Sequence, residues 1–241
     1  MADAGYTVRD QEKMSRAKNY FAWQRRLVER GLGKRVVEIG CGIGNFTGLL
    51  LDRELVVAVE SERACLKVFA ERYGAQANVR AVECDAASPA MRELARFHPD
   101  SCIALNVLEH IEDDCGALRH WAAILPERGS IVLLVPAFPA LFGPIDRNLG
   151  HYRRYTRRGL RELGARAGLA VRELRYVNAA GFVGWWINAR ILRLEEQAAK
   201  QIEFFDRWMA PVVSHMESAA PPPFGQSLLA VLEVTRAAEP Q

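Results

Sequence analysis

Short runs of apolar residues alternate with stretches of helical periodicity along most of the chain. The apolar runs are RVVEIG, ELVVAVE, NVRAVECD, SCIALNV and SIVLLVP, and the helical stretches begin near Asn45, Glu62, Pro89, Asp113 and Arg157. Such an alternation predicts an α/β fold, in which helices cover both faces of a parallel sheet. Two further runs near the C-terminus, AVRELRYVN and QSLLAVLEVTR, bring the expected number of strands to seven.

Two segments lie outside this alternation. Residues from about 9 to 30 predict an N-terminal helix, because apolar side chains recur there at helical spacing before Gly31. Residues 178–225 separate the last two strands, and a gap of that length should hold one or two helices of its own. The last two strands should then form a hairpin pair that this insertion interrupts. The expected division is an N-terminal helix (1–33), a core (34–177), a helical insertion (178–225) and a final strand with a tail (226–241).

Composition narrows the function classes. Half of the 241 residues are hydrophobic and a quarter are charged, which is ordinary for a globular protein with a sizeable core. The net charge of +3 is too small to indicate nucleic-acid binding, and the basic excess is confined to residues 147–175, with nine arginines against two glutamates. The five cysteines form no CxxC pair, so we expect reduced thiols and neither a disulfide framework nor a metal site.

The hydrophobic runs also bear on localisation. None offers the roughly 20 unbroken apolar residues that span a bilayer, and the N-terminus lacks the apolar core of a signal peptide. We therefore expect a cytoplasmic protein. Peripheral contact with the inner face of the membrane stays open, because the insertion is rich in aromatic and arginine residues.

The most specific motif is VVEIGCGIGNFT, residues 36–47. A buried strand should end at Glu38, and the three glycines that follow should form a tight turn into a helix. Glycine permits positive φ there and lets the backbone approach a ligand closely, while the helix N-terminus suits an anionic group. Dinucleotide enzymes use a similar turn, but they need a third glycine near the helix start, where this chain has Asn45 and Phe46.

Polar residues also end the next three predicted strands. Glu60 ends the second strand, where a carboxylate can accept hydrogen bonds from both hydroxyls of a ribose. Asp85 ends the third strand, in position for an adenine amine, and Asn106 opens the block NVLEH at the end of the fourth. All of these residues lie at carboxyl ends of parallel strands, where ligands bind in open α/β sheets.

In order and spacing, these motifs resemble those of class I S-adenosylmethionine-dependent methyltransferases, from Val36 to about Pro136. The resemblance implies a Rossmann-like sheet of seven strands, the last antiparallel, with S-adenosyl-L-methionine as cofactor and S-adenosyl-L-homocysteine as product. It also implies that Glu38 and the glycines hold the methionine part, Glu60 the ribose and Asp85 the adenine. The cofactor contacts expected in this way are Tyr20, Glu38, Gly40, Cys41, Gly42, Gly44, Asn45, Glu60, Ser61, Asp85, Ala86, Asn106 and Val107.

The resemblance extends to the N-terminal helix. In relatives with a preceding helix, that helix often forms a lid over the cofactor, and KNYFAW is similar to such lids. Tyr20 and Trp23 would then close over the methionine part. The alternative is that both belong to the core-facing stripe of an ordinary helix.

The segment HYRRYT, residues 151–156, follows three prolines on the loop after the fifth strand. It should therefore cross the rim of the cofactor cleft, a usual place for acceptor contacts. Arg153 and Arg154 can bind phosphate or carboxylate, and Tyr152 and Tyr155 offer hydroxyls and ring faces. Together with Trp186 of the insertion, these four residues are the expected acceptor site. The alternative is that the arginines are solvated and the tyrosines only pack.

Two histidines are candidates for a general base. His151 belongs to the same loop, and His110 belongs to the fourth-strand motif. Each has a structural or solvent-facing role as its alternative. A base is not obligatory, because the sulfonium is an activated donor and in-line positioning supplies much of the catalysis.

The insertion leaves three interpretations open. Its apolar side chains share one helical face, and arginines lie off that face; the apolar set is Val183, Trp186, Ile187, Ile191, Leu194 and Ala198. This composition suits an interfacial helix, a cap on the sheet or a dimer interface, so monomer and homodimer both remain open. Together with HYRRYT, the insertion resembles a bacterial methyltransferase subgroup associated with glycosyltransferases that act on lipid-linked sugars.

We therefore expect a methyltransferase for a small or amphiphilic acceptor, lipid-linked and anionic, with in-line attack on the sulfonium methyl. The alternatives are a soluble natural-product or sugar metabolite as acceptor, or a non-catalytic relative that binds the cofactor. Methylation of nucleic acid is disfavoured, because the sequence contains no separate binding module.

Overall fold

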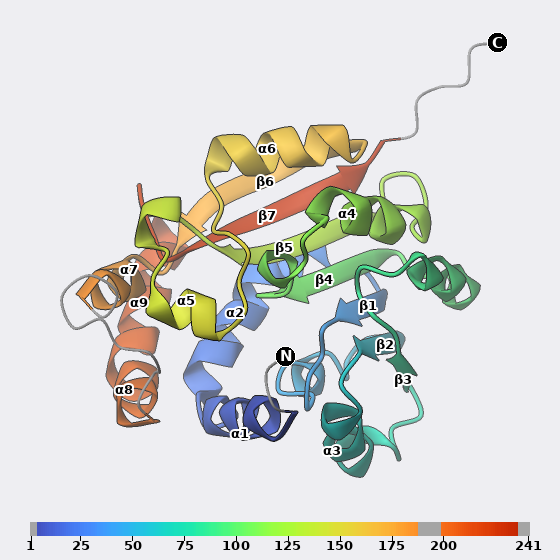
Figure 1. Ribbon diagram of the computed structural model, residues 1–241, viewed down its shortest axis with the longest axis horizontal. Helices are drawn as coiled ribbons and strands as arrows, with labels where there is room; N and C mark the ends of the chain where they lie inside the picture. The colour runs from blue at the N-terminus through green and yellow to red at the C-terminus, as the bar shows by residue number, and fades with distance from the viewer. Residues whose placement is uncertain (1–3, 188–198, 236–241) are drawn as a thin grey trace.

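A computed structural model describes residues 4–187 and 199–235 of the protein. The described residues form one sheet of seven strands in the order β3-β2-β1-β4-β5-β7-β6 (Figure 1). β7 runs antiparallel to both of its neighbours, and the other strands run parallel to one another, which confirms the expected Rossmann-like mixed sheet. The strands are β1 (Arg35–Ile39), β2 (Leu55–Glu60), β3 (Val79–Glu83), β4 (Ser101–Leu105), β5 (Ser130–Pro136), β6 (Leu169–Val177) and β7 (Ser227–Val234).

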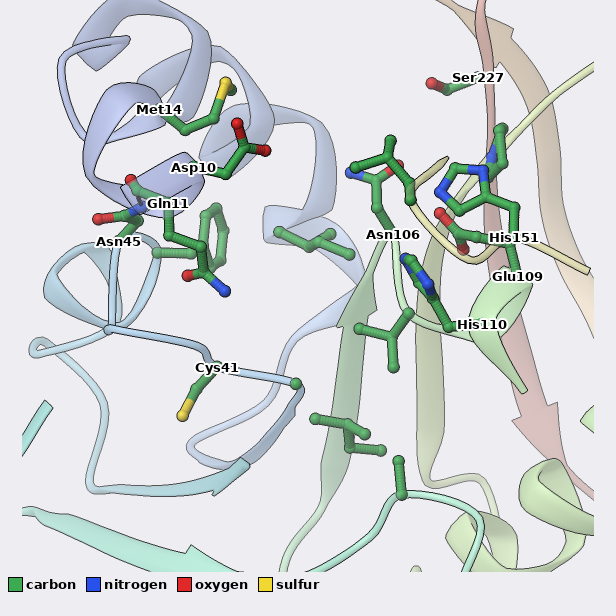
Figure 2. A pocket seen from close by; sticks show the side chains of 18 of the residues that line it. Asp10, Gln11, Met14, Cys41, Asn45, Asn106, Glu109, His110, His151 and Ser227 are labelled. Carbon is green, nitrogen blue, oxygen red and sulfur yellow. Dashed lines mark hydrogen bonds between the residues drawn. The ribbon is translucent and has the colours of Figure 1, made fainter. Parts of the chain in front are cut away.

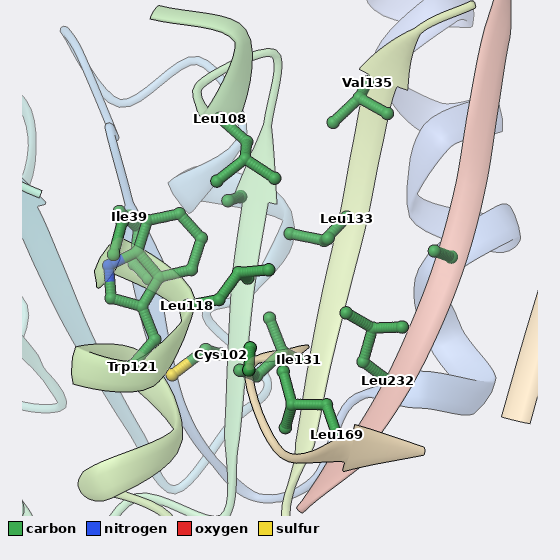
Figure 3. Close-up of a cluster of buried hydrophobic side chains, with 14 of the residues drawn as sticks. Ile39, Cys102, Leu108, Leu118, Trp121, Ile131, Leu133, Val135, Leu169 and Leu232 are labelled. Atoms are coloured by element: carbon green, nitrogen blue, oxygen red, sulfur yellow. The ribbon is translucent and has the colours of Figure 1, made fainter. Parts of the chain in front are cut away.

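Alternate residues of a strand point to opposite faces of the sheet, so each face buries its own core. In β1, Val37 and Ile39 belong to the core beneath α4 (Asp114–Ala123) and α6 (Arg157–Arg166), where Trp121 is fully buried (Figure 3). Val36 belongs to the opposite core, which includes side chains of α2 (Lys18–Val28), α3 (Arg63–Tyr73) and α9 (Ala210–Ala219). Because both faces are covered, the central strands are continuous apolar runs in the sequence.

The N-terminal segment forms two helices, α1 (Ala4–Met14) and α2, so the expected single helix is wrong. The helical conformation is interrupted at residues 15–17, and no neighbouring side chain caps the first turn of α2. Asp206 of the insertion supplies that cap, because its Oδ1 accepts a hydrogen bond from the Tyr20 backbone N–H at 2.8 Å. A cap that comes from 186 residues away leaves no local signal in the sequence.

The glycine turn leads into a single 3-10 turn, η2 (Thr47–Leu49), rather than the expected helix. Gly48 lies at its centre, and glycine disfavours helix propagation. The argument for an anion at a helix N-terminus therefore fails at this position. The segment from Pro89 is also a 3-10 helix; the 3-10 segments are η1 (Glu29–Gly31), η2, η3 (Pro89–Phe97), η4 (Leu108–His110) and η5 (Pro139–Leu141).

The insertion between β6 and β7 is helical, as expected. It contains α7 (Ala179–Trp186), α8 (Ala199–Phe204), the π-helical turn η7 (Phe205–Met209) and α9. Figure 1 shows these elements at the left edge of the sheet, where η7 and α9 contact α2. The expected apolar positions Ile191, Leu194 and Ala198 lie outside the described residues. Across the described part of the chain, no helix has the length and apolar character needed to cross a bilayer.

Candidate active site

A cavity of about 650 Å³ opens at the carboxyl ends of the parallel strands (Figure 2). In Figure 2, residues of α1 and the glycine loop lie on one side, while Asn106, Glu109, His110 and His151 lie on the other. The expected cofactor residues that line it are Tyr20, Glu38, Gly40, Cys41, Asn45, Glu60, Ser61, Asp85, Ala86, Asn106 and Val107. The cavity thus brings together residues from the ends of β1, β2, β3 and β4.

The path of the glycine loop requires glycine at two positions. Gly40 and Gly42 have φ of +69° and +56°, a region that residues with a Cβ rarely adopt. A Cβ on Gly40 would lie 2.5 Å from Cγ2 of Val107, and one on Gly42 would overlap the side chain of Gln11. The loop therefore packs closely between the fourth-strand motif and α1. Gly44, with φ of +83°, shapes the same loop.

Glu60 is held rigidly at the end of β2. Its Oε2 accepts a hydrogen bond from the Gly42 N–H at 2.8 Å, and its Oε1 accepts from the N–H groups of Ser61 and Glu62 at 2.8 and 2.9 Å. A carboxylate has about four acceptor sites, so these three N–H groups leave about one site, on Oε2, for a further donor. A ribose hydroxyl could occupy that site.

Glu38 is buried beside the glycine loop. The Thr47 hydroxyl donates a hydrogen bond to its Oε2 at 2.6 Å. Burial raises the pKa of the Glu38 carboxyl to about 8, and the charge of Glu60 acts in the same direction, against the hydrogen bond from Thr47. A cation placed at this wall of the cavity would favour the ionised form of Glu38.

Hydrogen bonds with backbone groups fix the positions of Asp85 and Asn106. Asp85 Oδ1 accepts a hydrogen bond from the Ala87 N–H at 2.8 Å, which holds the carboxylate at the end of β3. Asn106 adopts a φ of +53°, and its N–H donates to the Leu134 carbonyl at 2.8 Å. Cys41, in contrast, is buried, and burial raises the pKa of its thiol, so it is not a reactive thiolate.

The N-terminal segment forms one wall of the cavity through Asp10, Gln11 and Met14 of α1, which no motif in the sequence marks. Gln11 Oε1 accepts a hydrogen bond from the Ile43 N–H at 3.1 Å, and the Gln11 carbonyl accepts one from Asn45 Nδ2 at 2.8 Å. α1 therefore lies directly over the glycine loop. Tyr20 lines the cavity as expected, and burial raises its pKa to about 12. Trp23, however, packs in the core and does not line the cavity.

The cavity wall is acidic. The carboxylates that line it are Asp10, Glu38, Glu60, Asp85 and Glu109. Among the described lining residues, Arg154 is the single lysine or arginine, and it is paired with a buried carboxylate. The wall therefore favours a cationic ligand over an anionic one.

Arg154 is not available to bind an anion, in contrast to the sequence-based expectation. Its Nε donates to Asp146 Oδ1 at 2.8 Å, its Nη1 donates to the Ala137 carbonyl at 3.2 Å, and its guanidinium lies 4.6 Å from the Trp185 ring. Burial lowers the pKa of Arg154, and Asp146 counteracts this effect. A buried guanidinium needs such a partner, because an uncompensated charge in the interior is costly.

The other expected acceptor residues of this loop lie outside the cavity lining. Arg153 forms an ion pair with Asp114 at 2.8 Å, and the Tyr155 hydroxyl contacts Oδ2 of the same Asp114 at 3.1 Å. Tyr155 is part of the core, and Tyr152 is exposed to solvent. These three residues do not line the cavity, so the structure does not bring them together with the other expected site residues.

In the insertion, Trp185 lines the cavity, and the expected Trp186 does not. Trp185 is 7% exposed and lines the wall, whereas Trp186 is 46% exposed and faces outward. The rotation of α7 is set by Glu217 of α9, whose carboxylate accepts hydrogen bonds from the N–H groups of Asn178 and Ala179 at 3.0 and 2.9 Å. The apolar spacing of α7 could not reveal which side faces the sheet.

Both expected histidines line the cavity, next to Glu109. Their rings meet edge to face with centroids 4.6 Å apart, and His151 Nδ1 lies 2.9 Å from Asp146 Oδ1. Burial lowers the pKa of His110 to about 4, and His151 adds to this effect. Glu109 is fully buried, and neither of its carboxylate oxygens has a hydrogen-bond partner.

A family model described as a methyltransferase domain matches residues 9–174, which is more than half of the chain. The chain belongs to this methyltransferase family. The match covers α1 from residue 9, the glycine loop and the ends of β1 to β4, so it includes the cofactor side of the cavity. The protein is a class I S-adenosylmethionine-dependent methyltransferase. No curated protein matches its sequence.

Solved structures share the fold of this methyltransferase over nearly its whole length. A candidate methyltransferase of Haloferax volcanii, in complex with the Trm112 methyltransferase activator, has a TM-score of 0.64 at 15% identity and covers 97% of this chain and 98% of its own. A methyltransferase of Archaeoglobus fulgidus has a TM-score of 0.60 at 16% identity, with 90% and 94% covered. The N-methyltransferase NodS of Bradyrhizobium japonicum, bound to S-adenosyl-L-homocysteine, has a TM-score of 0.55 at 15% identity, with 91% and 87% covered.

The residues of the methyltransferase fit S-adenosylmethionine. Gly40 brings backbone without a side chain to the cavity wall, at a position where a Cβ has no room, and Glu60 is fixed with an acceptor site free. The cofactor carries an ammonium and a sulfonium, and the surrounding wall is acidic. Glu38 and the glycine loop would hold its amino-acid end, Glu60 its ribose and Asp85 its adenine.

Proposed function

We propose that this methyltransferase acts on an amphiphilic small molecule whose reacting end carries no negative charge. One observation carries the proposal: α7 and α8 each place one apolar side chain in the cavity wall and another on the outer surface. Trp185 and Ile202 line the cavity, whereas Trp186 and Phe204 are exposed. The apolar lining is therefore continuous with an apolar exterior along two helices.

The exterior of the insertion supports a lipid-linked acceptor. We call its exposed apolar side chains the insertion surface: Val183, Trp186, Ile187, Phe204, Trp208, Val212 and Met216. Arg207 and Lys200 are exposed beside them, and the Arg207 guanidinium lies 5.2 Å from the Trp208 ring. Aromatic and aliphatic side chains with interspersed cations are typical of segments that lie on an anionic lipid surface. We propose that the insertion surface makes peripheral contact with such a surface.

The charge of the cavity wall limits where an anionic group of the acceptor can bind. Five carboxylates face the interior, and the guanidinium of Arg154 is paired with Asp146. A phosphate or carboxylate of the acceptor would be repelled there. We place any anionic group of the acceptor outside the cavity, near Arg207 and Lys200.

Each wall of the cavity has a distinct task in the proposed reaction. Bound S-adenosylmethionine supplies an electrophilic methyl group on a sulfonium. The glycine loop, Glu38 and Glu60 fix the position of that group, and the apolar side chains of Leu149, Trp185 and Ile202 orient the acceptor and exclude water. His110 and His151 line the cavity across from α1 and the glycine loop, and we propose that they contact the acceptor.

Methyl-labelled S-adenosylmethionine, purified protein and a lysate of the source cells test this proposal. After reaction, the label is partitioned between an organic phase, an aqueous phase and a macromolecular precipitate. Label in the organic phase is the expected result. Label only in the aqueous phase would instead identify a soluble metabolite as acceptor. No transfer, despite measured cofactor binding, would indicate a non-catalytic relative.

Vesicle sedimentation tests the insertion surface separately. Wild type should bind phosphatidylglycerol vesicles more tightly than phosphatidylcholine vesicles. The variant Trp186→Ser/Trp208→Ser should lose most of this binding, whereas Tyr152→Ser, which removes an exposed aromatic ring outside the insertion, should keep it. Equal binding by all three proteins would contradict the role of the insertion surface.

A further inference from the structure

The side chains of Glu109, His110 and His151 converge on one point of the cavity wall. One potential ligand atom from each lies within 4.8 Å of the other two. Glu109 and His110 belong to η4, after β4, and His151 belongs to the loop between α5 (Pro144–Asn148) and α6. A backbone hydrogen bond from the Tyr152 N–H to the Glu109 carbonyl, at 2.8 Å, joins the two segments beside the cluster.

Glu109 is the member that calls for an explanation. It is fully buried, it lines the cavity, and both of its carboxylate oxygens lack a hydrogen-bond partner. A buried carboxylate without partners is costly, whereas buried charges in proteins are usually paired or coordinate metals. The guanidinium of Arg154, whose charge acts on Glu109, donates instead to Asp146 and to the Ala137 carbonyl.

The two imidazoles are arranged as metal ligands usually are. His151 Nδ1 lies 2.9 Å from Asp146 Oδ1, and Asp146 is fully buried. This carboxylate–histidine pairing fixes the ring and leaves Nε2 as the free electron-pair donor. The His110 ring is hydrogen-bonded to the backbone of Leu149, and it meets the His151 ring edge to face with centroids 4.6 Å apart.

We propose that Glu109, His110 and His151 bind one divalent transition-metal ion, and that its open coordination positions face the acceptor. Two imidazoles and one carboxylate suit Zn²⁺, Mn²⁺, Fe²⁺ or Co²⁺ better than Mg²⁺, which prefers oxygen ligands. The proposal rests on the proposed function, since it gives the two histidines a role toward the same acceptor. It also names the acceptor's reactive group as a hydroxyl, which a metal ion can coordinate and acidify.

The proposed step is balanced without any other reactant. Coordination lowers the pKa of the acceptor hydroxyl, and its proton leaves to water. The oxygen then forms a bond to the methyl carbon while the bond from that carbon to sulfur breaks. The products are a methyl ether, S-adenosyl-L-homocysteine and one proton.

Titration of the intact, metal-stripped chain with Co²⁺ tests the site directly. Wild type should take up one Co²⁺ per chain and develop its visible ligand-field absorption. Glu109→Gln, His110→Ala and His151→Ala should each weaken binding on the order of 100-fold, since loss of groups that merely orient ligands already costs 10–100-fold. His215→Ala, which removes an exposed histidine of α9, should bind Co²⁺ as wild type does.

The controls separate this proposal from the proposed function. S-adenosyl-L-homocysteine affinity is measured on every variant and should change less than about threefold, because Glu38, Glu60 and Asp85 lie at β1, β2 and β3 and not in the segment after β4. His110→Ala tests the site even if Glu109→Gln fails to fold, since the His110 side chain is open to the cavity. Co²⁺ uptake that is absent in wild type, or equal in wild type and all three variants, would overturn the metal site. If the labelled methyl group is still transferred to the acceptor in the presence of a chelator, the proposed function would hold without the metal site.

Discussion

The two halves of the cavity treat charge in opposite ways. On the cofactor half, at the ends of β1, β2 and β3, Glu38, Glu60 and Asp85 face the cavity with carboxylates that backbone N–H groups or a hydroxyl hold in place. On the acceptor half, after β4 and β5, the charged groups of the loop neutralise one another, as Arg154 and Asp146 do. The cofactor half therefore presents charged groups to a ligand. The charged groups of the acceptor half are instead neutralised by partners within the protein.

This contrast teaches why similar residue types carry different functions. A charged side chain at a strand end binds a ligand when its partners are fixed backbone groups that leave acceptor capacity free. It becomes structural when an opposite charge of the same chain is buried beside it. Breaking the contrast experimentally therefore requires one substitution in each half.

Arg154→Met should have the largest effect, and the effect should be on stability. The change leaves Asp146 buried with its main cation gone, which costs about 3–5 kcal/mol of the free energy of unfolding. Urea denaturation measures this loss. Arg158→Ala, which removes an exposed i,i+4 pair with Glu162, serves as control and should leave the urea midpoint unchanged. If the Arg154→Met variant were as stable as wild type but lost only its affinity for the acceptor, Arg154 would be an acceptor-binding residue after all.

Glu60→Ala should weaken S-adenosyl-L-homocysteine binding on the order of 100-fold. The change removes the ribose acceptor and also frees the N–H groups of Gly42, Ser61 and Glu62, and each hydrogen bond to a charged group contributes about 1.5–3 kcal/mol. Isothermal titration measures the affinity. Glu62→Ala is the matched control, because the interaction with Glu60 uses only the backbone of Glu62. Similar losses in the two variants would contradict the assigned role.

Cofactor binding at pH 7 should release about one proton from Glu38. Its pKa is about 8 in the free protein, so the carboxyl is mostly protonated at pH 7, and a cationic ligand favours the ionised form. The affinity should therefore rise with pH up to about 8, by at most about tenfold per pH unit. Titration calorimetry in two buffers of different ionisation enthalpy counts the proton. Glu38→Gln should abolish the release, and release that survives in this variant would assign the proton to another group.

Trp185→Phe should have the smallest effect. The change weakens the cation–π contact with Arg154, which contributes about 0.5–1 kcal/mol, so Tm should fall by about 1–4 °C. Trp186→Phe should leave Tm unchanged, because that ring is nearly half exposed. Calorimetry on the two variants compares neighbouring positions of one helix. The reverse order of the two Tm values would show that α7 is rotated relative to the sheet.

That Glu38, Glu60, Asp85 and Asn106 line the cavity was predictable because the information is local. Each lies within two positions of the carboxyl end of a strand, and the sheet order brings the strand ends together. Gln11 was missed, since a polar residue on an N-terminal helix has no spacing that marks it.

The acceptor half was not predictable, because its geometry depends on pairs that are distant or unmarked. Sequence reasoning found Arg154 but not Asp146, eight residues earlier, whose burial removes that arginine from the acceptor. It found the aromatic pair of α7 but not Glu217, which sets the rotation of the helix from 39 residues away. It found His110 and His151 separately, and only the folded loop places them against each other.

The cap that Asp206 supplies to α2 limits how this enzyme can be recombined with its relatives. Asp206 is 9% exposed, holds the Tyr20 N–H, and accepts a second hydrogen bond from Asn19 Nδ2 at 3.4 Å, while Arg16 pairs with Glu203 at 3.1 Å. The first helices and the insertion therefore depend on each other for their structure, although almost the whole core separates them along the chain. A chimera that swaps acceptor preference must carry both segments from the same parent.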